Sequence, residues 1–444
     1  MAQERSFRLF SGKGKYCQVD RHKDPFISWM DALVGLLLVI CPILQNYRGL
    51  LVDARATVLV LLVPYLLWAF WKKNRINWVL VVPLIGYGIL KIFAGGTSIV
   101  EIGREGLMCF YLLAVASEVV DTKKFTQMAT VVALLASALI IVQYICYYIF
   151  DYHLQLVPTG LFLDSSEQWE GLAETGLIGI TGKNLKFYRP SSFFLEPSHM
   201  AIYCIPTLLL LLLTPKMTKK RMIMAVVITV GIMASTSGMG IVLSMGLWFL
   251  YFALYFCEDR KTRSITIGRL KVNIINVVFV GALLVLFILM YLFVDVFRNS
   301  INRIFVNTDG SSALAGRTKS GVNILRNKMG FLDFLFGKRN PGPEADWYMS
   351  AFYGTIYDYG IFAFVLSYVF YVYSLFKLKR QYFWMALMIL GLSYFSVHTH
   401  GSSYMLYFCT FLLCGYSAQR VQAPFDLELQ IHPFGPIKKR KDNS

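Results

Sequence analysis

The thirteen residues from Arg189 to Ala201 read R-P-S-S-F-F-L-E-P-S-H-M-A and lead into an apolar run, Ile202 to Leu213. They gather a cation, two hydroxyls, a carboxylate and an imidazole at the start of a hydrophobic segment: Arg189, Ser191, Ser192, Glu196 and His199. Pro197 suits the first position of a helix, where its missing N–H costs nothing, and it favours an extended residue before it. The stretch therefore predicts a helix that begins at Pro197, and a capped start to a membrane helix is its simplest interpretation.

The rest of the chain is strongly apolar. Of its 444 residues, 56% are hydrophobic and 16% are charged, and the mean hydropathy is +0.55. A soluble protein carries about 25% charged residues. We therefore expect an all-α polytopic membrane protein, with one transmembrane domain (27–418) between a cytoplasmic N-terminal tail (1–26) and a basic cytoplasmic C-terminal tail (419–444). The first apolar run has no small-residue cleavage site after it, which predicts an uncleaved span.

Twelve apolar runs are long enough, or nearly long enough, to cross a membrane. A full crossing takes roughly 20 residues, and flanking Trp, Tyr and Lys side chains can complete the shorter runs. The stretch 222–256 could be one run or two, and its length favours two, divided at Ser235–Gly238. The runs are 27–44, 52–71, 76–93, 105–120, 126–150, 199–214, 222–236, 238–256, 272–294, 347–376, 382–397 and 403–418.

Lys and Arg are unevenly divided between the two sets of connecting segments. Twelve crossings give seven segments on the side of the termini and six on the other, and these hold 28 and 15 of the 43 basic residues. An excess of Lys and Arg marks the cytoplasmic side. We therefore expect both termini in the cytoplasm and the Arg189–Ala201 stretch at the outer face.

Two outer loops are long, 151–198 and 295–346, whereas every other connection is short. Long loops between packed elements are usually functional or disordered, and the aromatic residues of these two argue against disorder. In the second loop, apolar residues recur at near-helical spacing at Val322, Leu325, Met329 and Leu332–Phe336. This spacing predicts an amphipathic helix, either at the membrane surface or packed as a lid on the bundle.

Eight basic residues in the second outer loop oppose the general depletion of charge on that face. They are explained either by a solvated surface or by an anionic ligand: Arg298, Arg303, Arg317, Lys319, Arg326, Lys328, Lys338 and Arg339. The planar fork of arginine suits phosphate oxygens, so two arginines from different loops could clamp a diphosphate. Arg317, in A-G-R-T-K-S-G, and Arg189 are the candidates.

Three other positions could carry chemistry. The last outer turn, H-T-H-G-S-S, holds His398 and His400, which suit proton transfer better than metal binding because no acidic or Cys ligand is nearby. Asp358 lies inside an apolar segment, where an ionisable side chain is expensive and is a functional-site candidate by default. Tyr348 belongs to a set of outer aromatic residues that could anchor the interface or stack on sugar rings.

Two classes of partner are not expected. The net charge of +17 follows the membrane topology, so we predict no nucleic-acid partner. The eight cysteines are scattered and form no C-x-x-C pair, so we predict neither a metal site nor a disulfide framework.

The opening stretch resembles the R-x-S-G-x-F-x-E-P-S-x-x-A signature of bacterial O-antigen and capsule polymerases (Wzy type) and of the related O-antigen ligases. Ser192 stands where many members have Gly, and the matching residues are Arg189, Ser191, Phe194, Glu196, Pro197, Ser198 and Ala201. About twelve spans, two long outer loops and the Gly316-Arg317 pair in the second loop are similar as well.

The resemblance implies a glycosyltransferase with the C-type fold, in the bacterial cytoplasmic (inner) membrane, that needs no metal, cofactor or nucleotide sugar. It would transfer a glycan from one undecaprenyl diphosphate onto the sugar of another carrier-linked repeat unit. The implied partners are these carrier-linked oligosaccharides, the lipid bilayer, and a chain-length regulator and a flippase of the same pathway.

The resemblance also suggests roles for the site residues. Arg189 and Arg317 would bind the diphosphates, and a general base or acceptor-orienting group would come from Glu196, His398 or His400, a choice that the sequence leaves open. The remaining substrate-binding candidates are Ser191, Ser192, His199, Tyr348 and Asp358.

Two alternatives have to be weighed. Ligases typically carry a His-Asn pair just before the span that follows the second long loop, whereas this chain reads E-A-D-W-Y at 344–348, which favours a polymerase. A transporter or flippase for lipid-linked glycans would also want internal cations and many spans. Such transporters often show two similar halves, and no internal repeat is visible here.

Overall fold

The computed structural model is built almost entirely of helices, which confirms the predicted all-α class. It describes residues 25–45, 47, 54–71, 75–94, 99–116, 120–152, 154, 156, 190–194, 196–214, 217–254, 264–267, 270–305, 313–338, 349–396, 399, 401–419 and 426–428. Within those residues, four short strands form two antiparallel pairs.

A helix occupies most of each of the twelve predicted apolar runs. Their bounds are α1 Pro25–Leu44, α2 Ala54–Trp71, α3 Trp78–Ala94, α4 Ile99–Ala116, α5 Thr122–Phe150, α7 Pro197–Leu213, α8 Lys219–Ala234, α9 Gly238–Leu254, α10 Ile274–Phe293, α14 Ala351–Lys377, α15 Gln381–Phe395 and α16 Ser402–Gln419. The stretch 222–256 is two helices, as expected, with a turn at Ser235–Ser237 between them.

The start of α4 corrects one predicted boundary. The apolar run was expected to begin at residue 105, but the helix begins at Ile99 and includes Arg104 and Glu105. The prediction placed Arg104 outside the run and Glu105 at its first residue. They are accommodated because Glu105 forms an ion pair of 2.7 Å with Lys91 at the end of α3.

The second long loop contains three helices, α11 Asp295–Phe305, α12 Ala313–Lys328 and α13 Phe331–Phe336. The amphipathic pattern is therefore divided in two, and Gly330 separates the parts. The buried face of α12 also differs from the expected one, since Ile324 is buried and Val322 is exposed. The lid interpretation fits α12, because Ile324 packs with Met349 and Tyr357 near the start of α14.

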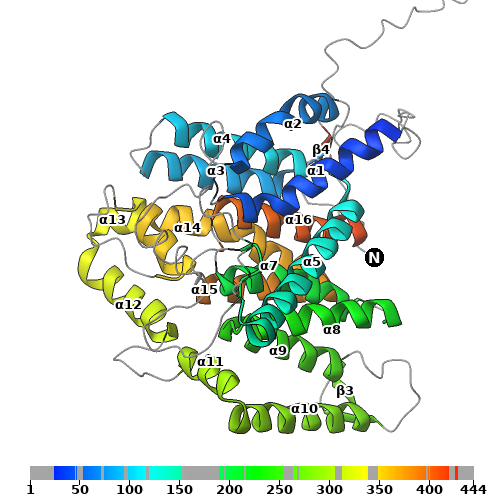
Figure 1. Cartoon of the computed structure of the whole chain (residues 1–444). Coiled ribbons are helices and arrows are strands. Elements are labelled where there is room, and N and C mark those ends of the chain that lie inside the picture. The colour runs from blue at the N-terminus through cyan, green and yellow to red at the C-terminus, as the bar shows by residue number, and fades with distance from the viewer. Residues whose placement is uncertain are drawn as a thin grey trace, which may run out of the picture.

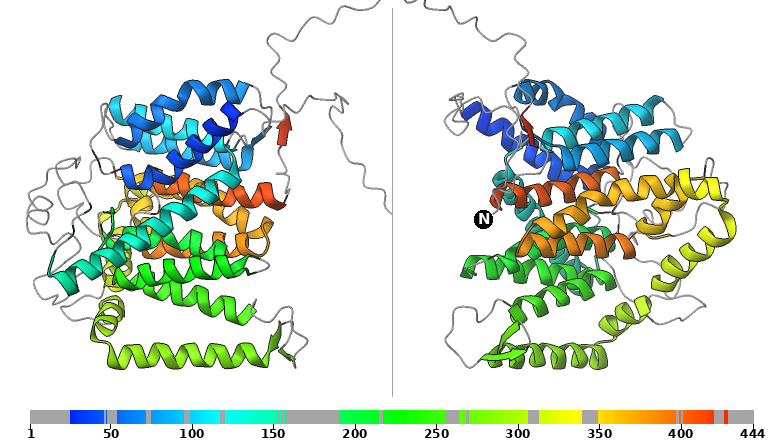
Figure 2. Two further views of the ribbon diagram at one scale, coloured as in Figure 1. Left: turned by 45° about the vertical axis from the view of Figure 1, so that its right-hand side comes forward. Right: turned by 180° about the vertical axis from the view of Figure 1, so that it is seen from behind.

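The two ends of the bundle carry different elements. At one end, β1 (Arg75–Asn77) pairs with β4 (Asp426–Glu428), and β2 (Ser264–Ile267) pairs with β3 (Leu270–Asn273). At the other end lie α12 and α13, on the left of Figure 1, and the view from behind in Figure 2 shows the same separation. We call this second end, where α7, α14 and α16 begin and α5 finishes, the motif end.

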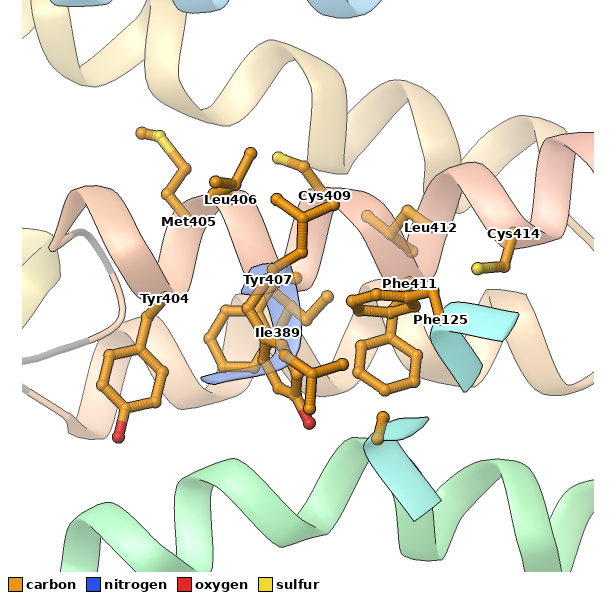
Figure 3. Close-up of a cluster of buried hydrophobic side chains, with 14 of the residues drawn as sticks. Phe125, Ile389, Tyr404, Met405, Leu406, Tyr407, Cys409, Phe411, Leu412 and Cys414 are labelled. Carbon is orange, nitrogen blue, oxygen red and sulfur yellow. The ribbon is translucent and has the colours of Figure 1, made fainter. Parts of the chain in front are cut away.

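The centre of the bundle is formed by α7 and α16. Tyr407 stacks on Tyr203 with ring centroids 4.8 Å apart, and its hydroxyl donates to the Tyr203 carbonyl at 3.1 Å. Phe411 and Phe125 meet edge to face at 5.0 Å. Figure 3 shows Tyr404, Tyr407 and Phe411 projecting from one side of α16. One cluster of buried residues runs from α1 to α16, so the helices share a core.

Two helices, α5 and α14, are long and apolar enough to cross a membrane by length and composition. Seven shorter apolar helices of 10–17 residues accompany them in the described part of the chain. Large apolar side chains are exposed along much of α10: Val278, Leu284, Val285, Leu286, Ile288, Leu289, Leu292 and Phe293. A soluble protein rarely exposes so extended an apolar face.

Candidate functional site

The turn that precedes α7 is fixed by a glutamine from α5. The Gln143 Oε1 atom accepts a hydrogen bond of 2.8 Å from the Ser192 N–H, and its Nε2 atom donates to the Leu154 carbonyl at 2.9 Å. A further bond of 3.0 Å joins the Phe194 N–H to the Ser191 carbonyl and closes the turn. One buried amide therefore ties the turn to both α5 and the chain that follows α5.

Ser192 adopts a left-handed backbone conformation, with a φ of 57°. A side chain in this region costs roughly 1–2 kcal/mol, whereas glycine adopts it freely. It is also the position at which the resembled signature has Gly. The Ser192 hydroxyl is buried and makes no hydrogen bond within the described part of the chain. Because buried polar groups are normally satisfied, this hydroxyl could serve a ligand or a water molecule.

The carboxylate of Glu196 stands just outside the N-terminus of α7. The helix begins at Pro197 as predicted, and Glu196 is extended, with φ −133° and ψ 150°. Its side chain does not cap the helix. Instead it accepts a hydrogen bond of 2.9 Å from the Ser198 hydroxyl. The half-buried carboxylate is therefore oriented by its own helix and keeps further acceptor capacity.

Side chains from α2 and α16 complete the surroundings of this turn. Tyr404 lies within electrostatic range of Glu196 and donates from its hydroxyl to the carbonyl of buried His199 at 3.3 Å. The neighbouring Ser403 accepts a bond of 2.6 Å from the guanidinium of Arg55, which is also buried. The buried guanidinium of Arg55 thus contacts α16 at Ser403, the residue next to Tyr404, and Tyr404 contacts the motif.

The loop between α1 and α2 also reaches the motif. The Tyr47 hydroxyl lies 3.5 Å from the Phe193 carbonyl, at the long limit of a hydrogen bond. The Tyr47 carbonyl accepts from the Ala54 N–H at 2.8 Å, at the start of α2. Burial raises the pKa of Tyr47 to about 12, so its hydroxyl stays protonated and remains a donor.

The helix α14 is interrupted two residues after Asp358. Gly360 has φ 84° and ψ 171°, so the helix is broken there. The freed Tyr357 carbonyl accepts a bond of 2.9 Å from the Lys338 N–H, just after α13. Gly337 is also left-handed, with φ 85°. A Cβ atom at Gly360 would lie 2.6 Å from the Gly337 nitrogen, so two glycines allow the two backbones to meet.

Charged and aromatic side chains surround this break. Lys91 forms the ion pair with Glu105, and its ammonium lies 5.8 Å from the centre of the Tyr359 ring. Asp358 lies within electrostatic range of Lys91. Tyr87 meets Tyr359 edge to face at 6.1 Å. The break therefore places the carboxylate of Asp358 near the Lys91–Glu105 ion pair and near aromatic rings at the motif end.

Arg317 lies on α12, one turn before Gly321. A Cβ atom at Gly321 would lie 2.6 Å from the Cγ atom of Tyr353, so this part of α12 is pressed against the first turn of α14. The backbone of Arg317 is thereby held at the motif end. The structure describes the backbone of Arg317 but not its side chain.

Four predicted site residues lie outside the described part of the chain: Arg189, Tyr348, His398 and His400. Thr399, between the two histidines, is described and buried, and its hydroxyl has no hydrogen-bond partner there. The motif end thus brings Ser191, Ser192, Glu196 and His199 together, and it places Asp358 in a separate cluster on α14.

Reasoning from sequence missed three participants: Gln143, Arg55 and Lys91. Gln143 is an amide deep within the apolar run 126–150, whereas Gln127 lies near the start of that run, and a buried polar residue needs a partner. That signal could have drawn attention to it. Nothing local marks Arg55 as buried or Lys91 as a member of an ion pair.

The described residues contain no group of three His, Cys, Asp or Glu side chains that could hold a metal ion. Independence from metals is still a prediction, because His398 and His400 are outside that part. A scan against protein-family models and a search of curated proteins found no match to this chain.

Proposed function

We propose that the protein is a multi-pass membrane enzyme whose twelve apolar helices cross the bacterial cytoplasmic membrane. The exposed apolar side chains of α10 support this proposal, because lipid would cover them. The charge distribution supports the orientation, with the motif end outside and the strand pairs β1–β4 and β2–β3 in the cytoplasm. Most of the helices are shorter than a full crossing needs. Local thinning of the bilayer would accommodate them, as would flanking side chains that extend to the membrane–water interface.

At the motif end the protein acts as a polysaccharide polymerase. It transfers a growing glycan from undecaprenyl diphosphate to a sugar hydroxyl of another carrier-linked repeat unit. The observation that carries this proposal is the left-handed conformation of Ser192. The signature that the stretch resembles has glycine at this position, and the backbone here has the conformation that glycine favours. This conformation supports the resemblance, because a glycine at this position would adopt it without strain.

The reaction breaks the bond between the anomeric carbon of the glycan and the diphosphate oxygen, and forms a bond from that carbon to the acceptor oxygen. Undecaprenyl diphosphate leaves with the bonding electron pair, and the acceptor proton passes to a base. Arg189 and Arg317 stabilise the charge on the leaving diphosphate. Glu196, held by Ser198 at 2.9 Å, is the one candidate base whose side chain the structure describes.

One observation favours a second candidate, a transporter for lipid-linked glycans. Transporters often bind substrates at broken helices, and α14 is broken at Gly360 beside Asp358. A polymerase makes longer glycans, whereas a transporter moves single units across the bilayer. Measuring both products therefore separates the two functions.

The decisive experiment is reconstitution of the purified protein in vesicles with carrier-linked repeat units. A ladder of longer glycans is expected from the wild type. Arg189→Ala and Arg317→Ala should each lower the rate by at least about 100-fold, while Arg326→Ala, an exposed control on α12, should not. Wild-type vesicles that only move single units across the bilayer would establish the transporter, and absence of any ladder would refute the polymerase.

A further inference from the structure

The short helix α13 exposes nearly all of its apolar side chains. Its sequence is F-L-D-F-L-F, and Phe331 and Leu332 are 77% and 69% exposed. Phe334 and Phe336 are exposed as well, and Phe336 packs on exposed Phe362 of α14 at 5.6 Å between ring centroids. The helix therefore adds little to the core, and it presents an apolar surface at the motif end. We call these five residues the α13 patch.

The α13 patch is held rigidly. Its helix ends at the contact between Gly337 and Gly360, where the two backbones are too close for any side chain on either residue. The hydrogen bond from the Lys338 N–H to the Tyr357 carbonyl adds a second attachment. A surface fixed through its backbone at two points can present exposed phenylalanines without losing its position.

Cations flank the α13 patch on both sides along the chain. Lys328 ends α12 just before it, and Lys338 follows it, with its ammonium 5.8 Å from the centre of the Tyr357 ring. Asp358 directly follows Tyr357, so the break in α14 lies next to the same surface. Figure 1 shows α13 at the edge of the bundle, beside α14 and continuous with α12, the helix of Arg317.

We propose that the α13 patch binds the isoprenoid chain of the lipid carrier next to its diphosphate. This inference rests on the proposed function, in which the motif end holds that diphosphate. The first isoprene units are bonded directly to the anion, so they must leave the site across an adjacent apolar surface. An apolar patch between two cations complements an apolar chain that ends in an anion.

Binding of farnesyl diphosphate tests the proposal. The full-length protein, in nanodiscs of phosphatidylcholine, is titrated with farnesyl diphosphate, dimethylallyl diphosphate and inorganic diphosphate. The wild type should bind farnesyl diphosphate most tightly. Phe331→Ala with Leu332→Ala should weaken that binding about tenfold and leave inorganic diphosphate unchanged, because only apolar contacts are removed.

A matched control lies on α10, where Phe293 is 78% exposed beside exposed Leu292. Leu292→Ala with Phe293→Ala removes a similarly exposed apolar pair from α10, which Figure 1 shows apart from α13, and it should leave all three affinities unchanged. The comparison of the three ligands on the wild type needs no substitution, so it tests the proposal even if a variant folds poorly. Equal affinity for the three ligands would contradict an isoprenoid site.

The outcomes separate this inference from the proposed function. A wild type that binds none of the three ligands removes the basis for both. Wild-type binding of farnesyl diphosphate that the α13 variant retains overturns the α13 patch alone. If nanodiscs of phosphatidylglycerol abolish the difference between variant and wild type, the patch binds ordinary anionic lipid and the proposal is wrong.

Discussion

The entrance to α7 and the break in α14 both depend on a left-handed residue, but they are built differently. At α7 the residue is Ser192, and it is held from outside by the amide of Gln143. At α14 it is Gly360, and it is held by backbone contact with Gly337. The first arrangement tolerates a side chain and leaves a hydroxyl available, whereas the second excludes every side chain. We therefore expect the α14 break to be the more sensitive to substitution.

The largest effect is expected at the α14 break. Gly360→Ala forces a Cβ atom against the carbonyl of Leu335 in a left-handed conformation, and should destabilise the protein by about 3 kcal/mol. Gly354→Ala, on the same helix with nothing within 4 Å of the added atom, should change stability by less than about 1 kcal/mol. Thermal unfolding in detergent compares the two. Equal midpoints would show that the break is not tightly packed.

Removal of the external support of Ser192 should have the next largest effect. Gln143→Leu leaves the Ser192 N–H and the Leu154 carbonyl without their partner, which costs about 2 kcal/mol. It should also slow glycan elongation, because the turn loses its attachment to α5. Gln127→Leu, at an exposed position on α5, is the control and should behave as the wild type. Normal elongation by folded Gln143→Leu protein would mean that the turn does not need the amide.

The charges beside the α14 break should contribute less. Lys91→Met removes the closer ion-pair partner of Glu105 and leaves only Arg104, at 4.0 Å, so it should cost about 1–2 kcal/mol, since the Lys91 and Glu105 side chains are mostly buried. Adding Glu105→Gln removes the stranded charge and should recover part of that loss. A double-mutant cycle of unfolding free energies measures the coupling. Additive losses would show that the pair is energetically independent.

The smallest effect should come from Ser192 itself. Ser192→Gly relieves the left-handed strain but gives the unfolded chain more freedom, so stability should stay within about 1 kcal/mol of the wild type. Ser192→Val adds a β-branched side chain at the same φ and should cost more. Unfolding midpoints and the glycan ladder together test this. A large loss for Ser192→Gly with an intact fold would assign the hydroxyl a direct role in the reaction.

The sequence predicts the helices well where apolar runs are uninterrupted, as in α5 and α7. It fails where distant partners compensate for charge or for broken backbone. The early start of α4 depends on Lys91, and the break at Gly360 depends on Gly337, more than twenty residues away. Neither is visible in a local pattern. The site shows the same limit, since Ser191, Ser192, Glu196 and His199 belong to one stretch, whereas Gln143 and Arg55 join them only through the fold.

The position of α16 has a consequence for how the protein is made. Tyr404, Tyr407 and Phe411 fill the centre of the bundle, yet they belong to the last helix in the described part of the chain. Until they are synthesised, Tyr203 lacks the Tyr407 ring on which it stacks, and Phe125 lacks two aromatic partners, Tyr407 and Phe411. The fourteen described helices that precede α16 therefore gain these central contacts only when α16 is added. During synthesis from the N-terminus, the step that adds α16 therefore closes the core.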